Sequence, residues 1–140
     1  MYYKYLNIFM ENPSILSHVS IGTNDYPAAK AFYTDLLTSA GFKVMEDLEE
    51  HQAICFGKQF PEFWVGQPHN GEPATPGNGV HISFFVSSNE LVDAFYHKAM
   101  ELGATDNGAP GPREHYGQGY YGAFVTDADG NKIEAMYWTE

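Results

Sequence analysis

Two histidines and two glutamates are the residues in this 140-residue chain whose types and positions could do chemistry together. His18 and His81 each begin a short apolar segment, and Glu62 and Glu134 follow them later in their respective halves. Two imidazoles and two carboxylates can bind a divalent first-row metal such as Zn, Ni, Co, Mn or Fe. The metal would polarise a carbonyl or stabilise an enediolate, with open positions for water or for two neighbouring substrate oxygens. The alternative is that these are unrelated polar residues on a solvated sheet face.

An internal repeat accounts for these matched pairs. Both histidines begin the pattern His-Val/Ile-Ser-Ile/Phe, and Ala-Phe-Tyr follows thirteen to fifteen residues after each of them. Gly41 and Gly103 then lie within one residue of the same register. Matches at so many fixed offsets indicate duplication of one structural unit. We therefore predict a single domain that consists of modules over about 15–67 and 80–138 and an N-terminal extension over 1–14.

Each module is predicted to contain one strand, one helix and three further strands. Pro27 lies near the start of the first helix, after Asn24 or Asp25 as a candidate N-cap. The predicted strands cover 15–21, 42–48, 52–56, 62–66, 80–86, 104–107, 120–126 and 132–138, and the predicted helices cover 28–40 and 89–102. A Gly- and Pro-rich linker over 67–79 joins the modules, and 127–131 is predicted to be a hairpin turn. The fold class is therefore α+β, with two βαβββ modules whose curved mixed sheets surround a cavity.

Strand alternation decides which side chains share a face of each sheet. The residues that alternate with His18 are apolar and belong under the helix, so His18 lies on the opposite, concave face. The same alternation places His81, Glu62 and Glu134 on the concave faces of their strands. We therefore expect one histidine and one glutamate at equivalent places in each module, His18 with Glu62 and His81 with Glu134.

Two stretches of the chain resemble a known module. The segment His18-Val19-Ser20-Ile21, followed by Ala31-Phe32-Tyr33, is similar to the first strand and helix of a glyoxalase-type module. The stretch 127–134 is similar to its closing signature, an acidic Gly turn before a strand that bears the last ligand. The resemblance covers about residues 15–138 and identifies the glyoxalase / bleomycin-resistance / extradiol-dioxygenase group, the vicinal oxygen chelate superfamily.

The resemblance implies three functions that differ in their metal ligands. Lactoylglutathione lyases use four protein ligands, and His18, Glu62, His81 and Glu134 occupy those positions here, with a glutamate as the base that moves a proton next to a carbonyl. Extradiol dioxygenases use two histidines and one glutamate with ferrous iron, which is the set that remains if Glu62 faces away. Bleomycin-binding members use no metal. We expect the first, a metal-dependent lyase or isomerase acting on a small oxygenated carbonyl substrate. The resemblance also implies a homodimer, because sites in this family are often built between paired modules.

The substrate is not expected to be glutathione. Glutathione carries two carboxylates that the lyases of this family hold with several basic residues, whereas this chain has one arginine. Substrate contacts are expected from the loop 108–119 and the start of the next strand, since loops with aromatic and polar groups suit a pocket wall. The candidates are Arg113, His115, Tyr116, Tyr120 and Tyr121. Each tyrosine could equally be an ordinary strand residue.

Composition and motifs exclude several other functions. The formal net charge of −11 repels phosphate backbones and anionic membranes, so no nucleic-acid or membrane partner is expected. Gly117–Gly122 matches G-x-G-x-x-G but precedes a predicted strand, so no dinucleotide cofactor is expected. The single cysteine, Cys55, excludes an internal disulfide and favours a reducing, cytoplasmic location.

Overall fold

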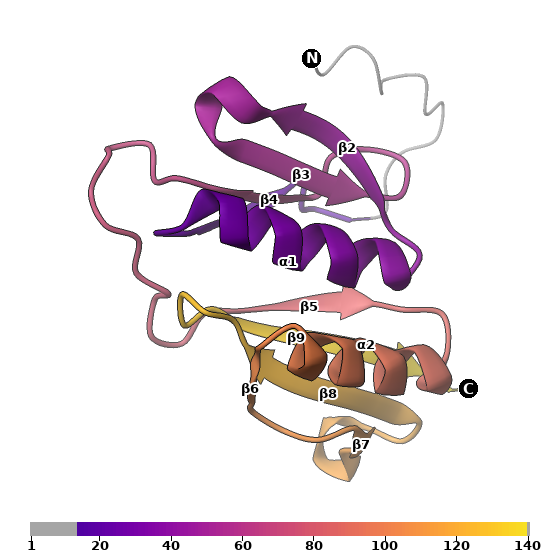
Figure 1. The fold of residues 1–140 in the computed structure, drawn as a ribbon. Helices are drawn as coiled ribbons and strands as arrows, with labels where there is room; N and C mark the ends of the chain where they lie inside the picture. The colour runs from indigo at the N-terminus through magenta and orange to yellow at the C-terminus, as the bar shows by residue number, and fades with distance from the viewer. Residues whose placement is uncertain (1–13, 140) are drawn as a thin grey trace.

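The computed structural model describes residues 14–139, which form two units of the predicted βαβββ type, the second with an additional two-residue strand that was not predicted (Figure 1). The first unit consists of β1 (Val19–Gly22), α1 (Tyr26–Ser39), β2 (Lys43–Leu48), the 3-10 turn η2 (Glu49–His51), β3 (Ala53–Gly57) and β4 (Phe63–Gly66). The second consists of β5 (His81–Phe85), α2 (Asn89–Glu101), β6 (Thr105–Asp106), β7 (Gly111–Pro112), the 3-10 turn η3 (Glu114–Tyr116), β8 (Tyr120–Thr126) and β9 (Lys132–Trp138). The predicted extension over 1–14 lies outside the described residues except for Ser14.

Each unit forms one mixed sheet in which the first strand lies at an edge. Sheet A has the order β1-β4-β3-β2, and sheet B has the order β5-β9-β8-β6 with β7 paired to β8. In both sheets the first strand runs parallel to the last strand of its unit, because the intervening helix returns the chain to the same end. The first strand is shorter than predicted, since the ladder ends where Val19 N–H donates to the Glu62 carbonyl.

The helix α2 begins at Asn89 as predicted, whereas α1 begins at Tyr26, two residues before its predicted start, and both helices end within one residue of the prediction. Asp25 caps α1 by accepting a hydrogen bond from the Ala28 backbone N–H at 3.1 Å, with Pro27 in the first turn. Gly41 follows the helix with a φ of +96°, a conformation that glycine adopts without steric cost. Ser88 caps α2 in the same manner, by accepting from the Leu91 N–H.

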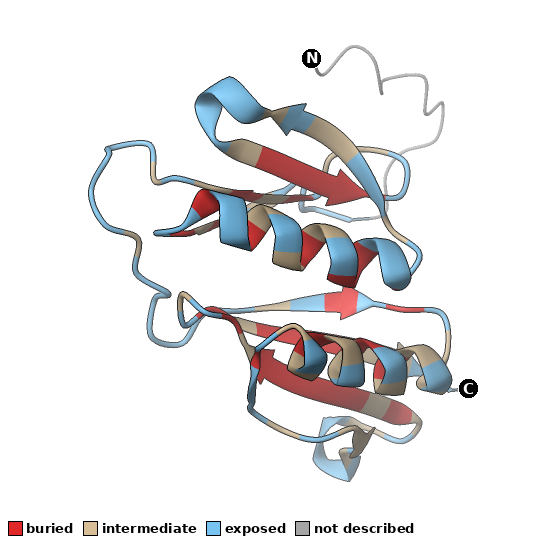
Figure 2. Ribbon diagram, in the orientation of Figure 1, coloured by how far each residue is buried: buried red, intermediate tan, exposed pale blue. Residues whose placement is uncertain are grey.

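The core lies between each helix and the sheet that it covers (Figure 2). Leu36 and Leu37 of α1 are fully buried against sheet A, and Val92 and Phe95 of α2 are buried against sheet B. Burial of each such side chain contributes about 1.5–3 kcal/mol. The two units share this core, because the rings of Phe63 on β4 and Phe84 on β5 meet edge to face at 4.9 Å. Each sheet therefore keeps its face opposite the helix, here called its open face, outside the main core.

The hairpin turn at 127–131 fastens the second unit to the first. Tyr33 Oη of α1 donates to Asp127 Oδ2 at 2.6 Å, and Thr23 Oγ1 donates to Asp129 Oδ2 at 2.6 Å. The side chain of Asn131 donates to the Gly22 carbonyl at 3.0 Å. Burial, together with Asp127, raises the pKa of Tyr33 well above its ordinary value, so its hydroxyl stays a donor. The turn thus fixes the position of one sheet relative to the other.

The linker at 67–79 returns along the open side of β1. The side-chain amide of Asn24 donates to the Ala74 carbonyl at 3.1 Å and accepts from the Ala74 N–H at 2.7 Å. Ala74 approaches β1 so closely that a Cβ at Gly22 would lie 2.8 Å from the Ala74 Cβ. These contacts hold the linker as a wall beside sheet A. Within residues 14–139, the helices are too short or too polar to cross a bilayer.

Candidate functional site

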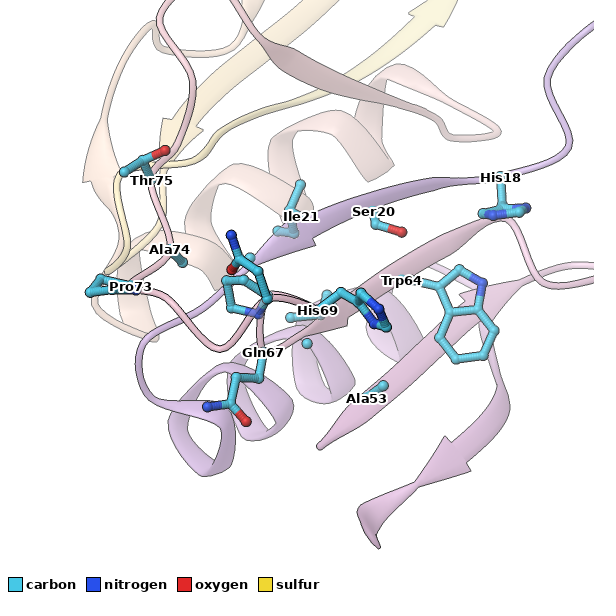
Figure 3. Close-up of a pocket in the computed structure, with 15 residues that line it drawn as sticks. His18, Ser20, Ile21, Ala53, Trp64, Gln67, His69, Pro73, Ala74 and Thr75 are labelled. Carbon is cyan, nitrogen blue, oxygen red and sulfur yellow. The ribbon is translucent and has the colours of Figure 1, made fainter. Parts of the chain in front are cut away.

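The open face of sheet A carries the first predicted histidine. His18 directly precedes β1, and Ser20 of β1 pairs with Trp64 of β4. These three residues line a hollow of about 570 Å³ between the sheet and the linker (Figure 3). Ser17 Oγ lies 3.1 Å from His18 Nδ1 and orients the imidazole.

Glu62 does not occupy the place in the first unit that Glu134 occupies in the second. Ser20 and Ser83 each follow the histidine of their unit by two residues, and Ser20 pairs with Trp64 whereas Ser83 pairs with Glu134. The counterpart of Glu134 is therefore Trp64, and the predicted equivalence of Glu62 with Glu134 is wrong. Alternation predicts which face of the sheet a side chain lies on, but it does not predict the register between strands. Glu62 and Trp64 are two residues apart and share a face, so alternation alone could not tell which of them matches Glu134.

The Glu62 carboxylate is directed to the backbone of a neighbouring turn. Its Oε2 accepts a hydrogen bond from the Lys58 N–H at 3.2 Å and lies 3.3 Å from the position of a Cβ on Gly57. Gly57 lacks the side chain that would otherwise fill this space. Glu62 thus caps the turn between β3 and β4.

The open face of sheet B carries a buried carboxylate. Glu134 is 6% exposed, and it alternates with Ile133 and Ala135, which are buried on the helix side. Tyr120 Oη donates to Glu134 Oε1 at 3.2 Å, and Ser83 Oγ donates to Oε2 at 3.1 Å. Within residues 14–139, no ion pair joins Glu134 to a cationic side chain. Two hydroxyl donors therefore satisfy this carboxylate in place of a positive charge.

Tyr120 reaches Glu134 by lying across a glycine. A Cβ on Gly122 would lie 2.1 Å from Tyr120 Oη, so no other residue at 122 permits this position of the phenol ring. Burial, and after it the Glu134 carboxylate, raises the pKa of Tyr120 above its ordinary value. The phenol therefore stays protonated and donates to Glu134 at neutral pH.

Three of the five predicted substrate residues gather beside this carboxylate. The Tyr116 ring lies 5.1 Å from the Tyr120 ring, and the His115 ring lies 4.3 Å from Tyr116. Tyr116 is 53% exposed at the rim of the open face. Tyr116 and His115 come from η3 within the loop 108–119, the loop from which substrate contacts are predicted.

The other two predicted substrate residues have other partners. The Arg113 guanidinium donates to the carbonyls of Ala109, Gly111 and Pro112 at 2.7, 3.0 and 3.3 Å, so it shapes its own loop. Tyr121 points to the helix side, where its hydroxyl donates to Asp93 of α2 at 2.6 Å. Neighbouring strand residues face opposite sides, so Tyr120 and Tyr121 cannot both reach one site.

The four predicted metal ligands do not meet within one copy of the chain. A cavity of about 570 Å³ at the junction of the units is lined by His18, Glu62 and His81, whereas Glu134 lies outside it. Across residues 14–139, no three His, Cys, Asp or Glu side chains are grouped so that they could hold a metal ion. The expected convergence of all four in a shared hollow is therefore wrong for a single copy, because the units lie edge to edge and each presents its own open face. His81 and Glu134 do share the open face of sheet B, two residues apart in register.

Two residues of the hollow on sheet A were not predicted as site residues. Trp64 was not predicted, although an alignment of the two predicted last strands from their first residues, Glu62 and Lys132, would have matched it to Glu134. His69 lies in the linker, and its side chain is directed into the hollow toward Trp64 (Figure 3). No periodic pattern marks a linker residue, so the sequence carried no signal for His69.

Comparisons with known proteins agree with this architecture. The profile of the Glyoxalase/Bleomycin resistance protein/Dioxygenase superfamily matches residues 15–135. A glyoxalase/bleomycin resistance protein from Albidiferax ferrireducens T118 is 34% identical, with a TM-score of 0.78 over 90% of this chain and 100% of its own. A search of curated protein sequences gave no significant match.

Two more distant structures share the fold. Lactoylglutathione lyase from Agrobacterium tumefaciens is 18% identical, with a TM-score of 0.62 over 91% of this chain and 95% of its own. The fosfomycin resistance protein FosX from Listeria monocytogenes is 20% identical, with a TM-score of 0.62 over 91% of this chain and 96% of its own. The profile match covers most of the chain, and it confirms the resemblance stated from the sequence. The chain belongs to the Glyoxalase/Bleomycin resistance protein/Dioxygenase superfamily.

Proposed function

We propose that the chain is a metal-dependent enzyme that acts on a small oxygenated molecule, with His18, His81 and Glu134 as the three protein ligands. The observation that carries this proposal is the Glu134 carboxylate, which is buried on an open face with two hydroxyl donors and has no ion pair among the described residues. Burial of an ionised carboxylate is costly unless a charge or a metal compensates it. A divalent ion next to His81 would supply that compensation.

The third ligand comes from a second copy of the chain in this proposal. Phe85 and Trp138 on the open face of sheet B are 58% and 41% exposed, which is a large apolar surface for a free sheet face. Coverage of this face by sheet A of a second copy would bury both side chains. The same pairing would set His18 opposite His81 and Glu134, so the proposal requires a homodimer.

The ligand set favours the two-histidine, one-glutamate arrangement of the dioxygenases over the four-ligand arrangement of the lyases. Trp64 stands where the fourth carboxylate would be, and Glu62 caps a turn. Two imidazoles and one carboxylate leave open positions and suit Fe(II), as well as other divalent first-row metals. The bound metal would hold two neighbouring substrate oxygens and supply oxygen or Lewis-acid chemistry there.

The residues around the ligands have positioning roles in this proposal. Tyr120 and Ser83 donate to separate oxygens of Glu134 and hold the carboxylate in one orientation, as donors around a metal ligand commonly do. Tyr116 and His115 form the rim through which the substrate enters. Trp64 closes the opposite wall and excludes water from the substrate.

Metal analysis of protein purified without chelator tests this proposal. Wild-type protein is expected to retain close to one divalent ion per chain, and His18→Ala, His81→Ala and Glu134→Gln are each expected to lose it. Glu62→Gln is the matched control, because it makes the same chemical change at the carboxylate that caps a turn, and it is expected to retain the metal. Loss of metal in Glu62→Gln as complete as in Glu134→Gln would overturn the three-ligand site and restore the lyase set.

Trp64 favours a second function, the metal-free binding of a small molecule. An indole in place of a carboxylate gives an apolar wall, which is how drug-binding pockets are commonly lined. Wild-type protein that carries no metal and takes up none of Fe(II), Mn(II), Co(II), Ni(II) or Zn(II) on titration would contradict the enzyme, and small-molecule binding by that metal-free protein would support this second function.

A further inference from the structure

The hollow on sheet A has a flat floor from which one indole rises. The residues around Trp64 on the open face are small: Ser20 on β1 and Cys55 on β3 are its register partners, and Gly22, Gly66 and Ala53 lie near them. Side chains of this size leave the sheet surface level beside the indole. The floor therefore matches a flat molecule that lies on the sheet and stacks against Trp64.

The linker supplies the outer wall of this hollow. Pro68, Pro73 and Ala74 line it, and the two hydrogen bonds between Asn24 and Ala74 fix their distance from the sheet. From this wall His69 extends into the space beside Trp64 (Figure 3). The hollow is thus a slot between two chain segments, with an imidazole from each side, His18 from the sheet and His69 from the linker.

The charge of the slot differs from that of the chain. The net charge is −11, yet none of the fifteen residues that line the slot is Asp, Glu, Lys or Arg. The polar groups in it are two imidazoles, hydroxyls and side-chain amides, which can all donate hydrogen bonds. An anionic oxygen would meet donors here without a carboxylate beside it.

We propose that this slot binds a planar conjugated acid, an aromatic or similarly flat ring with a carboxylate or phenolate oxygen, and that His69 is a specificity residue for it. The ring lies on the flat floor against Trp64, and its acidic oxygen accepts a hydrogen bond from His69. A planar conjugated acid would then be the substrate class of the proposed enzyme. The role of the slot in turnover rests on that proposed function. The binding itself needs no metal, because no metal ligand other than His18 lies in the slot.

Isothermal titration calorimetry in the presence of EDTA tests the proposal with 2-naphthoate as the probe. Cyclohexanecarboxylate has the same charge without a flat ring, and 2-naphthylmethanol has the ring without the charge. Full-length wild-type protein is expected to bind 2-naphthoate more tightly than either of them. Trp64→Leu is expected to weaken 2-naphthoate binding by about tenfold, and Trp64→Phe by less, since a ring is retained.

The histidine variants separate specificity from folding. His69→Ala is expected to weaken 2-naphthoate about tenfold and to leave 2-naphthylmethanol unchanged, because only the acid loses a charge-assisted bond. His51→Ala is the matched control, an exposed histidine on η2 outside the slot, and is expected to bind 2-naphthoate like wild type. Equal affinity for 2-naphthoate and cyclohexanecarboxylate, or a His69→Ala variant that binds like His51→Ala, would overturn the proposal.

The same measurements distinguish this inference from the proposed enzyme. Binding of 2-naphthoate in EDTA, together with a lack of metal in wild-type protein purified without chelator, would support the slot and contradict the metal enzyme. A protein that loses its metal on Glu134→Gln but shows no effect of Trp64→Leu or His69→Ala on 2-naphthoate would support the enzyme and contradict the slot.

Discussion

Replacement of Asp127 by alanine is expected to be among the most destabilising substitutions in the chain. The buried Asp127 carboxylate accepts four hydrogen bonds, from Tyr33 Oη at 2.6 Å, Asn131 Nδ2 at 3.0 Å and the backbone N–H groups of Asp129 and Asn131 at 2.9 and 2.8 Å. A bond to a charged group contributes about 1.5–3 kcal/mol, and a buried donor left unpaired costs about 1–3 kcal/mol. The partly buried Asp129 N–H can regain water, whereas the buried Tyr33 hydroxyl and Asn131 N–H cannot. We therefore expect a loss of about 3–5 kcal/mol, near the upper end for single substitutions.

Urea unfolding, followed by circular dichroism and tryptophan fluorescence, measures this loss. Tyr33→Phe removes one donor and is expected to cost about 1–2 kcal/mol, because the carboxylate keeps three. The double variant should lose little more than Asp127→Ala alone, since both changes break the same bond. Asp35→Ala, at an exposed aspartate of α1, is the control and should stay within about 0.5 kcal/mol of wild type. A loss below about 1 kcal/mol in Asp127→Ala, or additive losses in the double variant, would refute the role of this turn as the fastening between the units.

Three further predictions follow from local packing. Gly122→Ala should displace Tyr120 from Glu134 and cost about 1–3 kcal/mol in urea unfolding, and an unchanged stability would contradict the clash. Burial raises the pKa of the Cys55 thiol from 9.0 to about 11. As pH rises from 9.0 to about 11, the unfolded chain loses this proton before the folded chain does, so the free energy of unfolding falls over this pH range. Cys55→Ala should make that fall shallower, and identical pH profiles would contradict it. Asn24→Ala should release Ala74 and speed proteolysis within the linker 67–79, with cleavage elsewhere unchanged; equal cleavage rates would show that the linker is held by other contacts.

The sequence predicts the elements of this fold well because periodicity and capping are local properties. The strands over 120–126 and 132–138 have the predicted bounds, and the hairpin turn lies between them. Asp25 caps the first helix, as one of two predicted candidates. The repeat itself predicted two units of equal topology, since duplicated sequences fold alike. Each of these features depends on residues close to one another in the chain.

Features that depend on register or on distant partners could not be predicted in the same way. Glu62 and Trp64 share a face, so alternation cannot tell which of them stands opposite Glu134 in the duplicated plan. Tyr120 and Tyr121 were both expected at the site, although neighbours on a strand must diverge. Arg113 binds carbonyls of its own loop, which no composition argument reveals. His69 reaches its slot from a linker whose position depends on contacts between residues far apart in the chain, such as Asn24 and Ala74.

The two sheets share one arrangement of strands, but their open faces are chemically different. At the same register position, the second unit holds Glu134 with two hydroxyl donors, and the first holds Trp64 above small residues. A buried carboxylate suits a metal or a proton transfer, whereas an indole over a flat floor suits a ring. If each face worked alone, neither would combine binding with reaction. Under the proposed function, the pairing of unlike faces from two copies would resolve this, because it would set the binding face of one chain against the reacting face of the other. Under the proposed function, each dimer would then contain two complete sites, and a copy held as a monomer would bind 2-naphthoate but lack turnover.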